Sequence, residues 1–133
     1  MPATRSITQT VAVQASPSDV YDALVTAKLH AAFTQSAATG VARVGAKFTA
    51  WDGYISGVHR ELVRGEKIVQ DWWTTEWPEG AEPSRLEFVL TPTRTGTRVK
   101  MVHSNVPAEQ ADGYRQGWVD FYWTPLKAYF RKR

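Results

Sequence analysis

Three histidines, His30, His59 and His103, are the side chains of this chain best suited to acid–base chemistry. Alternation in β-like segments places His59 and His103 on faces that also carry apolar residues, so both could reach one interior cavity. Two imidazoles in one cavity could act as acid and base. Alternatively, each histidine lines or caps a ligand pocket with a single hydrogen bond. By the same alternation Glu61 shares the face of His59, where a carboxylate could orient a neighbouring imidazole.

Other reactive signatures are missing from the sequence. There is no cysteine, so neither a disulfide nor a thiolate metal site can form. No pair of histidines has a zinc-binding spacing, and no nucleophile elbow, phosphate loop or dinucleotide fingerprint is present. We therefore predict no metal and no cofactor, and we assign no catalytic residue. If the protein catalyses a reaction, His59 or His103 is expected to carry it.

Length and composition limit the class of protein. A chain of 133 residues has the size of one domain, predicted to span 1–133. No apolar run approaches the ~20 residues of a membrane helix, so no membrane partner is predicted. The first ten residues lack an apolar signal core, which favours a cytoplasmic location. The net charge of +3 comes partly from Arg131, Lys132 and Arg133. Because no longer basic run exists, this predicts a solvated helix end and no nucleic-acid partner.

The first third of the chain predicts a strand followed by two short helices. Residues 6–14 alternate apolar and polar residues, as a strand does. Ser16 is a good N-cap and Pro17 suits the first position of a helix. Residues 27–33 could form a second short helix.

The middle of the chain, from about 40 to 104, predicts an antiparallel meander. Asp52-Gly53 and the segment 64–66 are turn signals between strand-like runs, and 78–83 reads as a loop. The last strands present apolar residues and one histidine at alternate positions: Leu86, Phe88, Leu90, Val99, Met101 and His103.

The C-terminal segment, from about Pro107, predicts a long helix with a broad aromatic face. Its large apolar residues recur at helical spacing: Tyr114, Trp118, Phe121, Tyr122 and Leu126. Pro125 lies inside this pattern, and we expect a kink or break there. The order of elements predicts an α+β fold of two layers, in which a curved antiparallel sheet wraps around the C-terminal helix and leaves a cavity where the fit is incomplete.

The sequence resembles the START-like, helix-grip superfamily, also called SRPBCC. Within it, residues 10–130 are similar to the group named after the activator of the heat-shock-protein-90 ATPase. The motifs that carry the resemblance are Ser16-Pro17, FTAWDGYISG at 48–57, Glu61-Leu62, KIVQDW at 67–72, WPEG at 77–80, GTRVKMVHSNVP at 96–107 and QGW at 116–118. WPEG and QGW resemble the C-terminal domain of the eukaryotic co-chaperone.

The resemblance implies a helix-grip fold and leaves function open. The superfamily uses the cavity between sheet and helix for small, mostly apolar ligands, and some members, such as aromatase/cyclases, are enzymes. No catalytic residues are shared across it. The two-domain co-chaperone makes much of its chaperone contact through an N-terminal domain that this chain is too short to include. We therefore expect no stimulation of the ATPase by this chain alone.

Three tryptophans stand within residues 72–77, and alternation separates them. By the resemblance Trp72 is the tryptophan that faces inward, against the C-terminal helix and Trp118. Trp73 and Trp77 are expected on the opposite face. There, Trp73 could serve a protein partner or self-association, or pack on neighbouring strands. Trp77 is expected to anchor the WPEG loop.

The prediction is a domain that binds a small hydrophobic or amphipathic molecule, with a co-chaperone-like interaction protein as the alternative and a cyclase- or hydrolase-type enzyme as the third reading. A large closed cavity would favour ligand binding, a filled cavity with an exposed Trp73 would favour the protein partner, and two histidines within hydrogen-bond reach would favour the enzyme. The residues predicted to line the cavity are Trp51, His59, Trp72, Thr74, Phe88, Met101, His103, Trp118, Phe121 and Tyr122.

Overall fold

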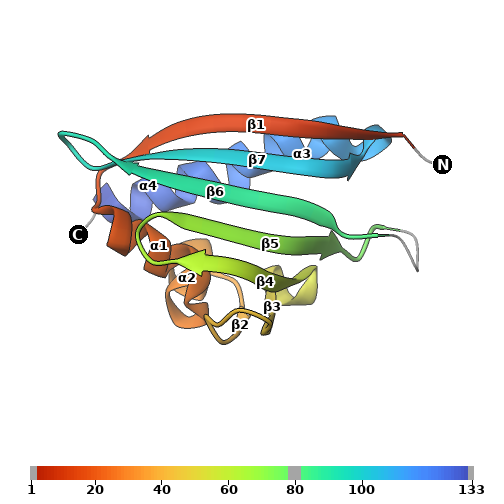
Figure 1. Cartoon of the computed structure of the whole chain (residues 1–133), viewed down its shortest axis with the longest axis horizontal. Coiled ribbons are helices and arrows are strands. Elements are labelled where there is room, and N and C mark those ends of the chain that lie inside the picture. The colour runs from red at the N-terminus through yellow and green to blue at the C-terminus, as the bar shows by residue number, and fades with distance from the viewer. Residues whose placement is uncertain (1–2, 78–81, 132–133) are drawn as a thin grey trace.

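The chain folds into two layers, a curved antiparallel sheet and a set of helices that cover one of its faces (Figure 1). The computed structural model describes residues 3–77 and 82–131. Within these residues the sheet has seven strands. In spatial order they are β1 (Thr4–Val13), β7 (Thr97–Pro107), β6 (Ser84–Pro92), β5 (Lys67–Thr74), β4 (Ile55–Val63), β3 (Lys47–Ala50) and β2 (Thr39–Gly40). This is the predicted α+β helix-grip arrangement.

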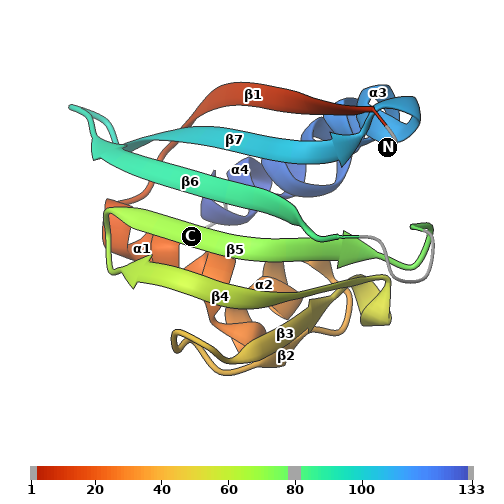
Figure 2. The same ribbon diagram turned by 45° about the vertical axis from the view of Figure 1, so that its right-hand side comes forward.

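Two short helices follow β1, as the sequence predicts. They are α1 (Pro17–Val25) and α2 (Ala27–Thr34). Ser16 caps α1, because its hydroxyl accepts a hydrogen bond from the Asp19 amide at 3.1 Å, and Pro17 occupies the first turn. Both helices lie below the long C-terminal helix, at the β2–β4 side of the sheet (Figure 2).

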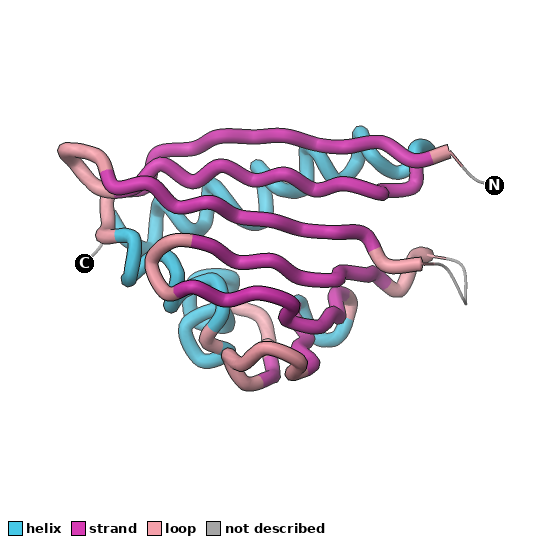
Figure 3. The backbone as a smooth tube through the Cα atoms, viewed as in Figure 1, coloured by secondary structure: helices cyan, strands magenta, loops and turns pink. Residues whose placement is uncertain are grey.

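The C-terminal helical run crosses the covered face of the sheet from the β1–β7 edge towards α1 (Figures 1 and 3). It comprises η2 (Ala108–Gln110), α3 (Ala111–Trp118), a π-helical turn η3 (Val119–Trp123) and α4 (Thr124–Arg131). Of the expected kink or break at Pro125, no break occurs, because Pro125 lies inside α4, and the departure from a regular α-helix is the π-helical turn η3 directly before it. The missing proline N–H is accommodated by the wider turn before it, in which the Thr124 amide bonds the Val119 carbonyl.

The core forms where the aromatic face of this helical run meets the sheet. Trp72 on β5 is only 3% exposed, and its ring lies 6.0 Å from that of Trp118 on α3. Phe88 and Trp123 pack edge-on at 6.1 Å beside them. The predicted inward direction of Trp72 and its contact with Trp118 are confirmed by these positions. The alternating residues of β6 and β7 are also buried, namely Leu86, Phe88, Leu90, Val99, Met101 and His103.

A β-bulge in β4 changes the predicted direction of one side chain. His59 pairs with Gln70, but the next pair is Glu61 with Val69, so Arg60 is the extra residue. Glu61 therefore does not share the face of His59, and that prediction is wrong. Its side chain is exposed and lies 3.5 Å from Lys67 in an ion pair on the other face of the sheet.

The other two tryptophans of β5 and its following turn differ from one another. Trp73 is half-buried and packs against the border of the core. Trp77 is 7% exposed, and its ring lies 5.8 Å from that of Trp72. The predicted placement of Trp77 on the opposite face is wrong, because β5 ends at Thr74 and the turn brings Trp77 back to the inner side. Of the predicted loop 78–83, residues 78–81 lie outside the described ranges.

We expect Trp72→Ala to cost ~3–5 kcal/mol of unfolding free energy, because it removes a buried indole from an aromatic cluster. Trp73→Ala should cost ~1 kcal/mol, because its side chain is half-buried. Urea unfolding of the two variants at pH 7 measures the difference. A greater loss for Trp73→Ala would show that the strand register is wrong.

Candidate functional site

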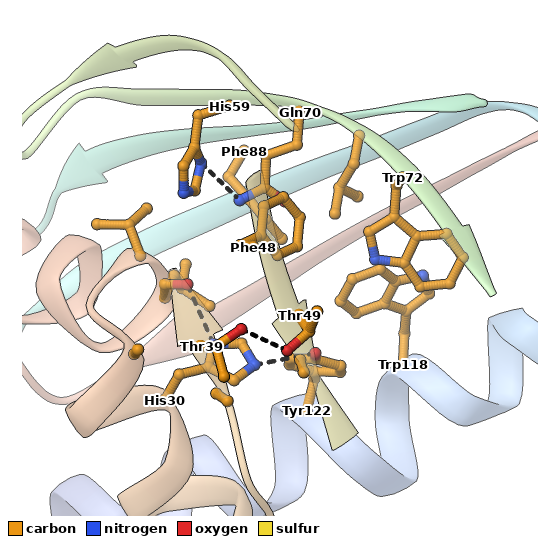
Figure 4. A pocket seen from close by; sticks show the side chains of 16 residues that line it. His30, Thr39, Phe48, Thr49, His59, Gln70, Trp72, Phe88, Trp118 and Tyr122 are labelled. Atoms are coloured by element: carbon orange, nitrogen blue, oxygen red, sulfur yellow. Dashed lines mark hydrogen bonds between the residues drawn. The ribbon is translucent and has the colours of Figure 1, made fainter. Parts of the chain in front are cut away.

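The interior between sheet and helix is almost filled. The pocket there has a volume of about 30 Å³, which leaves room for water but for no organic ligand. Figure 4 shows Trp72 and Trp118 side by side in this pocket, with Phe48, His59 and Gln70 at its other end. The large closed cavity that would have favoured ligand binding inside the fold is therefore not present in the described part of the chain.

His59 lies at the inner pocket and is 1% exposed. Its ring stacks on Phe48 at a centroid distance of 4.9 Å, and its Nδ1 lies 3.4 Å from the side-chain amide nitrogen of Gln70. The other ring nitrogen, Nε2, has no hydrogen-bond partner among the described residues. Burial lowers the pKa of His59, because the charged form loses its hydration.

His103 is fully buried and belongs to a chain of hydrogen bonds whose donors are all determined. The indole N–H of Trp118 donates to Nδ1 at 3.2 Å, so the neutral ring carries its proton on Nε2. Nε2 donates to the Ser84 hydroxyl at 2.7 Å, and that hydroxyl donates to the Trp72 carbonyl at 2.8 Å. Burial lowers the pKa of His103 to about 3. The imidazole is therefore a neutral structural bridge between sheet and helix.

His30 makes a similar bridge between the two short helices and the C-terminal helix. Its Nδ1 donates to the Leu24 carbonyl at 3.1 Å, and its Nε2 accepts from the Tyr122 hydroxyl at 3.0 Å (Figure 4). Burial lowers the pKa of His30 to about 4 and raises that of Tyr122. Both groups remain neutral near pH 7.

The histidines do not form a common acid–base site. His59 is on β4 and His103 on β7, with β5 and β6 between them. At a spacing of ~4.8 Å per strand, their backbones are about 14 Å apart. Each of the two has its own hydrogen-bond partner. The two histidines are therefore not within hydrogen-bond reach of each other, which the hypothesis of an enzyme requires.

A larger space opens at one end of the sheet. A groove of about 610 Å³ lies where β4 begins and β5 ends, between the 3-10 turn η1 (Trp51–Gly53) and the helical wall formed by α3 and η3. This volume is in the range of small-molecule sites. More than half of its lining residues are aromatic, and the full lining is Trp51, Tyr54, Ile55, Trp72, Glu76, Glu109, Gln110, Gly113, Tyr114, Gly117, Trp118, Phe121 and Tyr122.

Two aromatic side chains stand at the mouth of the groove. Phe121 is 56% exposed, and its ring meets that of Trp51 edge-on at 5.4 Å. Trp51 has a positive φ of 52°, a conformation that is rare for a bulky side chain and often marks a functional position. The indole nitrogen of Trp51 is buried and lies close enough to the Tyr122 hydroxyl to act on it as a donor, which opposes the rise that burial gives the pKa of Tyr122.

The opposite end of the groove is polar. The hydroxyl of Tyr114 accepts from the Trp77 indole at 3.0 Å and donates to the Gln110 side chain at 3.0 Å, so the Thr74 hydroxyl, at 2.7 Å, donates to it. Nearby, the Tyr54 hydroxyl donates to the Glu76 carboxylate. Burial, and then this carboxylate, raise the pKa of Tyr54, so the phenol remains a donor.

The helical wall of the groove has two positions without a side chain. Gly113 and Gly117 lie four residues apart on α3 and therefore on one side of the helix, and both line the groove. A Cβ at Gly113 would meet no atom within 4 Å, and one at Gly117 would only touch Phe121 at 3.8 Å. Packing therefore does not require glycine at either position. Because glycine costs a helix interior ~1 kcal/mol relative to alanine, the two glycines keep open space at a cost in stability.

The ten residues predicted to line a cavity divide between these places. Trp51 and Phe121 line the groove, while Trp72, Trp118 and Tyr122 line both the groove and the inner pocket. His59 and Phe88 line the inner pocket alone. Thr74, Met101 and His103 are buried and line neither. Sequence reasoning missed the remaining groove residues; the one available signal was two glycines at helical spacing inside an otherwise helical pattern.

The sheet, the helix that it grips and the groove between them define a helix-grip domain of the START-like class. The family described as "Activator of Hsp90 ATPase homolog 1-like protein" matches residues 14–131, and the chain belongs to this family.

Named relatives agree with this assignment. The chain is 32% identical over 117 residues to the "Activator of 90 kDa heat shock protein ATPase homolog" of Dictyostelium discoideum, and 33% identical over 115 residues to the human "Activator of 90 kDa heat shock protein ATPase homolog 1". These alignments cover 88% and 86% of this chain but 30% and 34% of the relatives. The chain thus spans about a third of the length of the curated relatives that it matches.

Solved structures share the fold. An HSP90 activator from Plasmodium falciparum superimposes with a TM-score of 0.81 at 22% identity, over 94% of each chain. The solution structure of the Aha1 dimer from Colwellia psychrerythraea gives a TM-score of 0.79 at 20% identity, over 93% of this chain and 95% of the other. In the described residues, no group of three potential metal ligands occurs. No helix among them is long and apolar enough to cross a membrane.

We expect the stability of the protein to fall as the pH is lowered from 7 to 5. The pKa of His103 is about 3 in the fold against 6.5 when unfolded, so below pH 6.5 the unfolded chain binds the extra proton. This linkage removes about 2 kcal/mol between pH 7 and pH 5. Urea unfolding at both pH values measures the loss. His103→Gln should remove the part that is due to His103, while His30, whose pKa is about 4 in the fold, continues to contribute. An unchanged pH dependence in this variant would contradict the assignment.

Proposed function

We propose that the protein binds a small amphipathic molecule in the groove between η1 and α3–η3. The proposal rests on the bare helical wall, where Gly113 and Gly117 leave room that no packing contact requires. The strained backbone at Trp51 and the apolar mouth at Phe121 support the same site.

The amphipathic character of the ligand follows from the two ends of the groove. The mouth offers the faces and edges of Trp51 and Phe121, whereas the far end offers hydroxyl, amide and carboxylate groups. A wholly apolar molecule would displace water from the carboxylates of Glu76 and Glu109 in this lining, which costs free energy. The inner pocket is too small to take part, so the groove alone is proposed as the ligand site.

Filling the groove from the helical side tests the proposal. We expect Gly113→Leu and Gly117→Leu each to reduce binding of a neutral apolar reporter, N-phenyl-1-naphthylamine, by at least tenfold, because the added side chain occupies ligand space. Both variants should be as stable as the parent protein or more so, since leucine is the better helix former. Fluorescence titration measures the affinity, and thermal unfolding measures the stability.

Gln116→Leu is the matched control, because Gln116 is exposed on the same helix and does not line the groove. Reporter binding that survives both glycine replacements would place the ligand elsewhere. Native mass spectrometry of the purified protein would show a co-purified molecule, and that molecule should be lost in the two variants but retained in the control.

A second function, a co-chaperone-like interaction with heat-shock protein 90, is favoured by family membership. The relatives in Dictyostelium and human are named as activators of the 90 kDa heat-shock-protein ATPase. For such a contact we favour the groove region over the outer face of the sheet. Trp73, the residue that the sequence singled out for the outer face, is half-buried and packs against the core.

We expect these 133 residues alone to leave the ATPase rate of heat-shock protein 90 unchanged at stoichiometric ratio, because they correspond to about a third of the named activators. A steady-state ATPase assay checks this, with the human activator as the positive control. Clear stimulation by the isolated chain would refute the expectation and would make chaperone activation its direct activity.

A further inference from the structure

We propose that the groove selects organic cations that carry an aromatic or apolar body. The inference rests on the proposed function, since it names the class of ligand for the same site. It is carried by the charge of the groove, by the unused hydrogen-bond acceptor sites of one carboxylate and by the number of aromatic rings in the lining.

The groove has the opposite charge to the protein as a whole. The chain carries a net charge of +3, yet the lining of the groove contains two carboxylates, Glu76 and Glu109, and no lysine, arginine or histidine among the described residues. Side chains that would repel a cation are thus kept out of a site on a basic protein. An anionic ligand would meet two solvent-exposed carboxylates of like charge with no counter-ion in the lining, which disfavours its binding.

Glu76 is poised to meet a cation. Within the described part of the chain its carboxylate has one hydrogen-bond donor, the Tyr54 hydroxyl, and no ion-pair partner. A carboxylate offers about four acceptor sites, so most of its capacity is unused. The bond from Tyr54 fixes one oxygen and leaves the other for an ammonium group. The backbone carbonyl of Glu76 also accepts a long bond of 3.5 Å from Gln110, which ties this turn to α3.

The aromatic lining suits the rest of such a ligand. Seven of the lining residues carry aromatic rings, and the faces of such rings attract cations. At the mouth, Trp51 and Phe121 pack edge to face at an interplanar angle of 74°, and Phe121 is 56% exposed, so part of its ring is open to a ligand. An ammonium group near Glu76 and an apolar body towards Phe121 would use both ends of the groove at once.

A competition experiment separates the charge preference from binding itself. N-phenyl-1-naphthylamine serves as the reporter, and three naphthalene probes that differ in charge displace it: 1-naphthylmethyltrimethylammonium, the neutral 1-naphthaleneacetamide and 1-naphthaleneacetate. We expect the cation to displace the reporter at a concentration about tenfold below that of the neutral probe, and the anion to be the weakest. Raising the salt concentration should reduce the advantage of the cation.

Variants test whether the preference for the cation depends on the carboxylate of Glu76. Glu76→Gln keeps an acceptor for Tyr54 and should remove most of the advantage of the cation, while affinity for the neutral probe stays within about twofold. Glu66→Gln is the control, because Glu66 is exposed in the turn between β4 and β5 and does not line the groove. If Glu76→Gln does not fold, Glu109→Gln and the salt dependence give the same comparison.

The outcomes are distinct. Reporter binding with equal displacement by all three probes, or with preference for the anion, would overturn the cation inference and leave the proposed function standing. Failure of the reporter and of all three probes to bind would refute the proposed function itself. Stronger displacement by a lysine-rich peptide than by the small cation would overturn the choice of a small molecule.

Discussion

The structure depends on the packing of a wide aromatic helix face into the concave side of the sheet. Trp72 and Trp118 meet at its centre, with Phe88 and Trp123 beside them. Because these rings fill the interior, the described residues leave only a small pocket beneath the middle of the sheet. The free volume lies at the end of the sheet, where the helical run begins and where Gly113 and Gly117 carry no side chain. The position of the candidate site is thus a consequence of how well the core is filled.

Two of the buried histidines are compatible with this core because both of their ring nitrogens are hydrogen-bonded. His103 and His30 each use one ring nitrogen as donor and the other as acceptor, and burial keeps both imidazoles neutral. A neutral imidazole with a hydrogen bond at each ring nitrogen connects two elements without leaving a buried charge. Such residues fix the positions of the sheet, the short helices and the C-terminal helix relative to one another. The same chemical features that make histidine an attractive catalytic candidate in a sequence serve here as structural links.

Regular elements were predictable from the sequence, and departures from regularity were not. The alternation of Leu86, Phe88 and Leu90 and the cap at Ser16 describe local geometry that the fold preserves. The bulge at Arg60 reverses the direction of Glu61, because one extra residue shifts a two-residue period. The π-helical turn has a similar effect, since Phe121 becomes exposed while the adjacent Tyr122 and Trp123 are both buried. The groove is assembled from segments whose relative placement depends on these irregularities, so its full lining could not be deduced.

The glycines of α3 also bear on how the protein moves. A helix with two glycines, a polar exposed side and a π-helical turn at its end has less intrinsic support than α4, whose Leu126 and Phe130 are buried. Segments of this kind open locally at a lower free energy than the rest of a fold. Amide protons of α3 should therefore exchange with solvent faster than those of α4 or β7. Such a helix could let a ligand enter or leave the groove while the core around Trp72 stays closed.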